Sequence, residues 1–282
     1  MNKFCIFILT FGRPENQITL KTLQRLKVTA PIYLVCSDDD KRLWEYQAIY
    51  GDKVVVFNKD EAVKQCNIDL MINSDDKKAI IFARCYVFKI AEKLGFKYFI
   101  ELDDDYQGFY VADFNKQSWI LNNKINLQKI FQKAIDFYAN NKILLGFSLS
   151  QGGDFFGGIS KEKQRIKRKA MNSFFCDTAR PLNFKGLINE DVNYYVGDGA
   201  KFGITMQMHN IKLIQQETQK NKGGMTNIYV DNGTYFKSLY SVLVAPSAVK
   251  IALMGEKHKR LHHKINYNAI CPKILREEVK NA

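Results

Sequence analysis

In Tyr98-Phe99-Ile100-Glu101-Leu102-Asp103-Asp104-Asp105, an apolar run with the composition of a strand ends in three consecutive carboxylates. So much negative charge at the end of a buried strand is costly unless a positive group lies beside it. A divalent cation carrying a phosphorylated ligand is a common solution, because hard cations bind carboxylate oxygens and bridge to phosphate. In an open α/β sheet, ligands bind at the carboxyl ends of the strands, which is where these aspartates fall. A solvated acidic turn is the alternative.

Strand-like and helix-like segments alternate through the first half of the chain. Short β-rich runs lie at 3–9, 31–36, 53–57 and 97–102, and helix-like stretches lie near 15–27, 40–50 and 76–94. The last of these is the clearest, because its apolar residues recur at steps of three and four before Gly95 supplies a stop. A further helix near 124–140 precedes a strand near 143–149. Apolar strands separated by helices predict an α/β fold, with a mostly parallel mixed sheet and helices on both faces.

The second half of the chain is richer in glycine and in basic residues, and its strand signals are less regularly spaced. No Pro- or Ser-rich linker and no internal repeat separates it from the first half. We therefore predict a single domain over 1–282, in which 1–150 binds a nucleotide and 151–282 binds an acceptor.

The composition is that of a folded, basic protein, with 46% hydrophobic residues and a formal net charge of +13. This charge favours a polyanionic partner, either nucleic acid or an anionic membrane surface. The apolar N-terminal run is too short for a membrane span and precedes no cleavage site, so we expect no membrane anchor. The six cysteines lack CxxC spacing, which favours reduced thiols and a cytoplasmic location.

Two turns that follow the first two strands carry candidate binding residues. After the first strand, in Thr10-Phe11-Gly12-Arg13-Pro14, Gly12 permits close backbone approach and Arg13 suits a phosphate or a base. After the second, Asp38 could accept hydrogen bonds from a ribose or a base. The alternatives are an ordinary turn in the first case and a cap of the next helix in the second.

Arg84 and the pair Glu190-Asp191 are the next candidates. Arg84 lies in the apolar helix, and a buried arginine requires a partner, either an acidic group or a phosphate. A carboxylate of Glu190-Asp191 could act as a general base on an attacking hydroxyl. It could equally cap a helix and interact with its dipole.

Three basic segments follow in the second half. Lys222 lies in a glycine-containing loop that could close over a diphosphate or could be plain surface. A histidine of the stretch 257–264, such as His262 or His263, could complete a metal site with the aspartates, although a lone histidine is more often structural. The run 161–169, with Arg165, Lys167, Arg168 and Lys169, is either a phosphate-contacting patch or a solvated loop.

The order of these motifs resembles that of glycosyltransferases with the GT-A fold, especially the inverting family-2 type. In that resemblance, Asp103-Asp104-Asp105 corresponds to the DxD motif, which holds Mn²⁺ or Mg²⁺ and the sugar nucleotide. Phe82-Ala83-Arg84 resembles the Ala-Arg element that precedes the DxD strand, and Glu190-Asp191 resembles the motif that supplies the base.

Four further stretches are similar to the TET/JBP-associated glycosyltransferases of bacteriophages, a resemblance that spans most of the chain. They are Gln151-Gly152-Gly153-Asp154-Phe155, Lys169-Ala170-Met171-Asn172-Ser173-Phe174-Phe175, Ile188-Asn189-Glu190-Asp191-Val192-Asn193 and Asn221-Lys222-Gly223-Gly224-Met225-Thr226. The resemblance implies transfer of a sugar from a nucleotide-sugar, such as a UDP-sugar, to a 5-hydroxymethylpyrimidine in double-stranded phage DNA. The acceptor would be 5-hydroxymethylcytosine, made by a partner TET/JBP-like dioxygenase or a base hydroxymethylase, in the host cytoplasm.

The resemblance also implies a role for each candidate residue. Asp191 would be the base, with Glu190 orienting the acceptor. The nucleotide-sugar would contact Thr10, Gly12, Arg13, Asp38, Arg84, Asp103, Asp104 and Lys222. The metal would be held by Asp103 and Asp105 with His262 or His263, and DNA by Arg165, Lys167, Arg168 and Lys169. The competing hypotheses are a family-2-type transferase acting on a polysaccharide or a protein, a nucleotidyltransferase, and a catalytically inactive DNA-binding module.

Overall fold

The computed structural model describes residues 1–66, 80–113, 118–121, 125–151, 169–198, 203–215, 226–254 and 259–270. In these ranges one nine-stranded sheet runs through the molecule in the order β3-β2-β1-β4-β8-β7-β9-β5-β6. Its strands in chain order are β1 (Phe4–Leu9), β2 (Ile32–Ser37), β3 (Val54–Phe57), β4 (Tyr98–Asp103), β5 (Tyr106–Asp113), β6 (Ser118–Leu121), β7 (Leu144–Gln151), β8 (Phe174–Asp177) and β9 (Ile204–Gln215).

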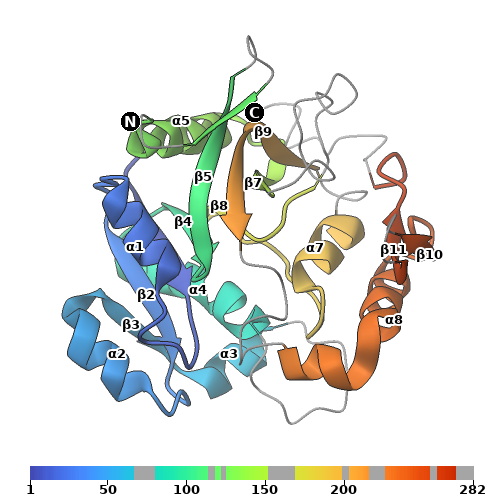
Figure 1. The fold of residues 1–282 in the computed structure, drawn as a ribbon, viewed down its shortest axis with the longest axis horizontal. Coiled ribbons are helices and arrows are strands. Elements are labelled where there is room, and N and C mark those ends of the chain that lie inside the picture. The colour runs from blue at the N-terminus through green and yellow to red at the C-terminus, as the bar shows by residue number, and fades with distance from the viewer. Residues whose placement is uncertain are drawn as a thin grey trace.

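Helices lie on both faces of the sheet. They are α1 (Ile18–Arg25), α2 (Leu43–Tyr50), α3 (Lys59–Gln65), α4 (Ile81–Lys93), α5 (Leu127–Asn140), α7 (Glu190–Asp198) and α8 (Thr226–Val244), with a short 3₁₀ turn at Gly51–Lys53. Figure 1 shows α1 and α2 on one side of the molecule, and α7, α8 and a separate hairpin on the other. The hairpin consists of β10 (Val249–Met254) and β11 (Arg260–Ile265). No helix in the described ranges is long and apolar enough to cross a membrane.

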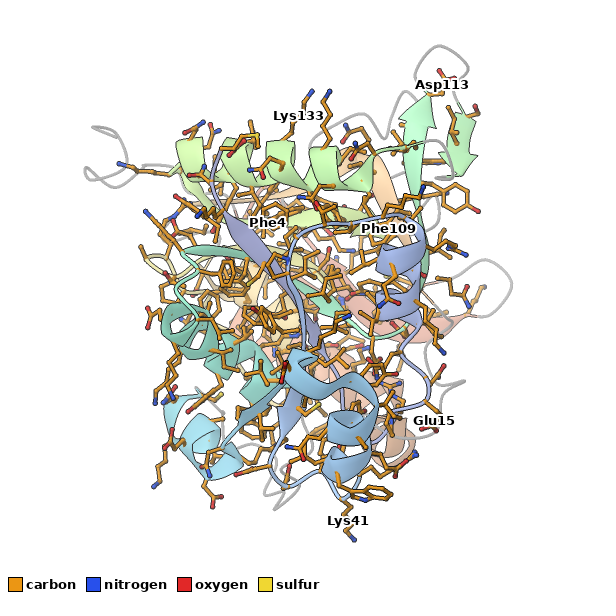
Figure 2. All side chains as sticks on the ribbon, turned by 90° about the vertical axis from the view of Figure 1, so that its left-hand side faces the viewer. Phe4, Glu15, Lys41, Phe109, Asp113 and Lys133 are labelled. Carbon is orange, nitrogen blue, oxygen red and sulfur yellow. The ribbon has the colours of Figure 1, made fainter. Side chains whose placement is uncertain are left out.

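The residues of β1 alternate between two hydrophobic cores, one on each face of the sheet. Cys5, Phe7 and Leu9 pack with α4 and α7, whereas Phe4, Ile6 and Ile8 pack with α1 and α5. A strand that is buried on both faces must be apolar at every position, which is why the sequence at 3–9 reads as a continuous hydrophobic run. In Figure 2, Phe4 lies in the sheet below α5, whose Lys133 points to solvent.

The predicted fold class is confirmed, with the parallel pairings concentrated in the first half. Strands β3, β2, β1 and β4 are mutually parallel, as are β7 and β9. The pairings β4–β8, β8–β7, β9–β5 and β5–β6 are antiparallel, which makes the sheet mixed. The predicted helix at 15–27 is shorter than expected, because residues 12–17 form the loop that follows β1.

Candidate active site

The end of β1 and the end of β4 lie side by side, because the two strands are parallel neighbours with Leu9 opposite Asp103. Thr10, the next residue after β1, donates a hydrogen bond from Oγ1 to Asp104 Oδ2 at 2.7 Å. Arg13 forms an ion pair with the other oxygen of Asp104 at 2.9 Å. The structure thus brings together three of the residues predicted to bind the nucleotide-sugar, and Asp104 itself is almost fully buried.

The loop after β1 is held by two side chains for which the sequence predicted no role. Gly12 has a φ of +70°, and its N–H donates to Asp40 Oδ2 at 2.6 Å. Left-handed backbone of this kind favours glycine, which accounts for the residue at this position. The N–H of Arg13 donates to the hydroxyl of Tyr46 at 2.8 Å. Asp40 and Tyr46 therefore fix the backbone that presents the Arg13 guanidinium.

Arg84 is buried against three carboxylates, so acidic groups, one of the two partners that the sequence left open, contact it in this structure. Its Nη1 pairs with Glu101, its Nη2 with Asp103 at 3.1 Å, and its Nε with Glu190 at 3.0 Å. The guanidinium also lies over the ring of Phe174, with 5.3 Å to the centroid. Arg84 therefore ties the end of β4 to the first turn of α7.

One guanidinium does not neutralise the carboxylates around it. Burial raises the pKa of Glu101 to about 7, although Arg84 acts in the opposite direction. Burial and repulsion from Asp191 raise the pKa of Glu190 to about 7 as well. Both Glu101 and Glu190 favour the protonated form more strongly than an exposed glutamate, because their charged forms lack solvation. Glu101 had no predicted role, since it lies inside the apolar run of β4.

Asp191 follows Glu190 in the first turn of α7 and is 8% exposed. Its Oδ1 accepts a hydrogen bond from the N–H of Val192 at 2.7 Å. Asp103 lies close enough that the Asp191 charge helps burial to raise its pKa, while Arg84 lowers it. The predicted base and the predicted DxD motif therefore belong to one electrostatic cluster.

The turn that leads into α7 is clamped to α8. Asn189 has a φ of +56°, and its Nδ2 donates to the carbonyl of Lys237 at 2.8 Å and to Ser241 Oγ at 3.2 Å. Ser241 Oγ in turn donates to Asn193 Oδ1 at 2.9 Å. These bonds set the position of the Glu190-Asp191 pair between Asn189 and Asn193.

Asp105 is the aspartate best suited to a cation. It is partly exposed, and its Oδ1 is buried without a hydrogen-bond partner among the described residues. Burial, followed by repulsion from Asp103 and Asp104, raises the pKa of Asp105 to about 7. Since carboxylate oxygens are the ligands that Mg²⁺ and Mn²⁺ prefer, Asp103 and Asp105 fit such an ion.

Among the described residues, His262 and His263 do not form a metal-binding group with these aspartates. In the described ranges, no group of three or more His, Cys, Asp and Glu side chains is arranged to hold a metal ion. His262 and His263 lie on β11, and successive residues of a strand point to opposite faces. Their predicted metal contact stays a prediction.

The remaining predicted binding residues are exposed, buried or outside the described ranges. Asp38 is exposed, and its carboxylate accepts hydrogen bonds from Asn58 Nδ2 at 2.8 Å and from the N–H of Lys59 at 2.9 Å. Lys169 is only 3% exposed, so it does not form part of an open basic surface in this structure. Lys222, Arg165, Lys167 and Arg168 lie outside the described residues.

Residues 4–224 match the family described as TET-Associated Glycosyltransferase. The chain belongs to this family. The match contains every element from β1 to β9 and ends before α8, and it confirms the predicted TET/JBP-associated glycosyltransferase. Comparison with the curated proteins finds no match.

Solved structures show distant likeness to this TET-associated glycosyltransferase. Glucosyl-3-phosphoglycerate synthase from Mycobacterium tuberculosis, in complex with Mg²⁺ and UDP, is 7% identical, with 94% of this chain and 88% of that chain covered and a TM-score of 0.45. S. aureus TarS 1-349 is 14% identical, with 86% and 66% covered and a TM-score of 0.40. A cytidylyltransferase from Leptospira borgpetersenii is 15% identical, with 64% and 62% covered and a TM-score of 0.32. The match thus spans less than two thirds of the cytidylyltransferase.

Proposed function

We propose that this protein transfers a sugar from a nucleotide-sugar to the hydroxymethyl group of a 5-hydroxymethylpyrimidine in double-stranded DNA, with 5-hydroxymethylcytosine as the expected base. One observation carries the proposal beyond the family match. Arg84 contacts Asp103 at 3.1 Å and Glu190 at 3.0 Å, so the strand end suited to a donor and the helix start suited to a base meet in one buried cluster.

On the donor side, the proposed contacts come from the loops after the parallel strands. Arg13 keeps a buried Nε that has no partner in the described part of the chain, and a phosphate oxygen or a base carbonyl would accept its hydrogen. Asp38, exposed after β2, suits the hydroxyls of a ribose, and Lys222 would add a charge beside the diphosphate. We expect UDP as the nucleotide. Mn²⁺ or Mg²⁺ bound by Asp103 and Asp105, with His262 or His263 as a further ligand, would neutralise the charge that develops on the diphosphate.

On the acceptor side, Asp191 is the proposed general base. It takes the proton from the hydroxymethyl oxygen as that oxygen forms a bond to the anomeric carbon of the sugar. The bond from that carbon to the diphosphate breaks on the opposite face, so the product has inverted configuration. Glu190 is held by Arg84, whose Nε donates to Glu190 Oε1 at 3.0 Å, and this fixed carboxylate is suited to orient the acceptor.

The proposed acceptor is a base inside a duplex, so it must be turned out of the stack to reach Asp191. The net charge of +13 is consistent with a DNA partner. Arg165, Lys167 and Arg168 are the proposed phosphate contacts, and Lys169, which is buried, is left out of this set. The acceptor base requires a hydroxymethylating enzyme, either a TET/JBP-like dioxygenase acting on DNA or a base hydroxymethylase acting on nucleotides. The cytoplasm is the proposed compartment.

The test is transfer to DNA in a mixture of defined composition. The purified protein is incubated with Mn²⁺, a panel of sugar nucleotides and duplex DNA containing 5-hydroxymethylcytosine, 5-hydroxymethyluracil or cytosine. Nucleosides are then analysed by mass spectrometry, with the Asp191→Asn protein as the control. One sugar added to a hydroxymethylated base, and none to cytosine, is the expected result. Transfer only to a glycan or a protein acceptor would overturn the proposal.

A further inference from the structure

Two amide side chains form a chain of hydrogen bonds that ends on Asp105. Asn172 Nδ2 donates to Gln215 Oε1 at 2.7 Å, and Gln215 Nε2 donates to Asp105 Oδ2 at the longer distance of 3.4 Å. The second oxygen of Asp105, Oδ1, is the buried oxygen that has no partner among the described residues. The bonded and unbonded oxygens of Asp105 are therefore distinguished by this chain.

The orientation of both amides follows from the chemistry of the carboxylate. An aspartate that binds a cation is ionised, so it accepts hydrogen bonds and donates none, and Gln215 turns its NH₂ group towards Asp105. The Gln215 side-chain oxygen then faces Asn172, so Asn172 must donate a hydrogen bond from its own NH₂ group. A change of donor to acceptor at position 172 would therefore reverse the amide of Gln215.

We call this chain of hydrogen bonds from Asn172 through Gln215 to Asp105 the relay. The backbone holds Asn172 and Gln215 in the positions that the relay requires. Gln215 ends β9 and lies opposite Tyr106, the residue that follows Asp105, just before the register shifts between Tyr106 and Gly108. Asn172 has a φ of +63°, which asparagine tolerates better than most residues, and its carbonyl accepts a hydrogen bond from the buried hydroxyl of Tyr106. Thr19 fixes the turn itself, since its Oγ1 donates to the carbonyl of Asp103 and accepts from the N–H of Tyr106.

We propose that Asn172 and Gln215 are positioning residues for the donor site, which hold Asp105 through Oδ2 and so keep Oδ1 available for a divalent cation. This inference rests on the metal-dependent donor site of the proposed function. It assigns a purpose to a left-handed asparagine in the segment 169–175 and to the final residue of β9. A partner that contacts a ligating carboxylate directly, as Gln215 contacts Asp105, changes metal affinity by about 10- to 100-fold when removed, whereas Asn172 acts only by setting the orientation of the Gln215 amide.

The test compares Asn172→Asp with Asn172→Gly. The aspartate accepts from Gln215 Nε2, so the amide reverses and its oxygen repels Asp105. The glycine tolerates the positive φ and leaves Gln215 free to donate to Asp105. Mn²⁺ binding is measured at fixed UDP without DNA, from the electron paramagnetic resonance signal of free Mn²⁺. We expect Asn172→Asp to weaken Mn²⁺ binding by about 10- to 100-fold and Asn172→Gly by less than about threefold.

This order of Mn²⁺ affinities separates the relay from an electrostatic effect and from a structural one. An added negative charge acting only through electrostatics would tighten Mn²⁺ binding, and a purely structural role would make the smaller glycine the more damaging change. Gln215→Leu should weaken Mn²⁺ binding as strongly as Asn172→Asp. If Asn172→Asp does not fold, the Mn²⁺ affinity of Gln215→Leu tests the proposal instead. Gln132→Leu is the matched control, because Gln132 also donates to a carboxylate, Asp136 at 3.2 Å, on α5.

The outcomes distinguish the relay from the function it serves. Equal Mn²⁺ binding by Asn172→Asp and Asn172→Gly, or unchanged binding by Gln215→Leu, would overturn the relay alone. Failure of the unaltered protein to bind Mn²⁺ with UDP would overturn the metal site and the relay together. Failure to glycosylate DNA, with the predicted order of Mn²⁺ affinities intact, would overturn the proposed acceptor and leave the relay standing.

Discussion

Replacement of Arg84 by methionine should be among the most destabilising changes in this chain. Methionine fills much of the same space, but it leaves Glu101, Asp103 and Glu190 without their shared cation. Removing one partner of a buried ion pair costs about 3–5 kcal/mol, because the other charge stays buried and uncompensated. The three contacts share one guanidinium, so their costs do not add, and we expect about 3–5 kcal/mol in total at pH 8.

The cost of Arg84→Met should shrink as the pH falls. Without Arg84, the pKa values of Glu101 and Glu190, already about 7, rise further above those of the unfolded chain. The folded variant then binds more protons than its unfolded state, so its free energy of unfolding decreases as pH rises. At pH 5.5 the two glutamates are mostly protonated, and the uncompensated charge that causes the loss is reduced.

Urea unfolding at pH 5.5 and pH 8 measures both quantities, with Arg42→Met as the matched control. Arg42 pairs with Glu15 and Glu45 on the surface, where its side chain is 37% exposed, and such solvent-exposed pairs contribute little to stability. The reasoning fails if Arg84→Met costs no more than Arg42→Met at pH 8. It also fails if the loss for Arg84→Met is the same at both pH values.

Four further results are expected. Asp105→Ala should abolish metal-dependent UDP binding while the free energy of unfolding stays equal or rises, because like-charge repulsion is removed; calorimetry and thermal unfolding check this. Asp191→Asn should lower turnover by about two to four orders of magnitude with little change in donor binding. The product of the unaltered protein, analysed by NMR, should have the anomeric configuration inverted relative to the donor. Affinity for DNA should fall about tenfold or more from low to physiological salt, and charge reversal within the run 161–169 should weaken binding to all sequences alike in fluorescence anisotropy. The thermal midpoint of the metal-free protein should fall as pH rises from about 4.5 to about 7, because folding raises the pKa values of Glu101 and Glu190 from 4.5 to about 7. A midpoint that rises over this range would contradict the raised pKa values of these two glutamates.

The strands and helices that the sequence predicted well are those whose burial fixes their pattern. The runs at 3–9 and 97–102 are largely apolar because both faces of β1 and β4 are covered, and they lie within one residue of the observed strands. The strand β8 has only four residues, and its partners β4 and β7 are distant in sequence, so no local sequence pattern predicts this strand. The long β5 was also missed, because a bulge and Gly108 interrupt its alternation.

The candidate site shows the same division between local and long-range information. Arg84 was found because an arginine in an apolar helix is unusual in itself. Glu101 was missed, because only the register that places it opposite Phe7 and Phe174 shows it inside the cluster. Gln215 and Asn172 could not be predicted either, since a polar residue at the end of a strand or in a loop has no distinctive spacing. Their relation to Asp105 depends on how β9 pairs with β5.

If Asp191 is the base, as proposed, the contacts that hold the turn before α7 extend the active site beyond the residues that match the family. Asp191 lies within the matched residues 4–224, whereas Lys237 and Ser241, which hold Asn189, lie beyond them in α8. A chimera that kept residues 4–224 and exchanged the rest would retain the carboxylate of Asp191 but lose the α8 residues that hold the turn before it. Engineering of acceptor choice in this protein should therefore treat α7 and α8 as one unit and move them together.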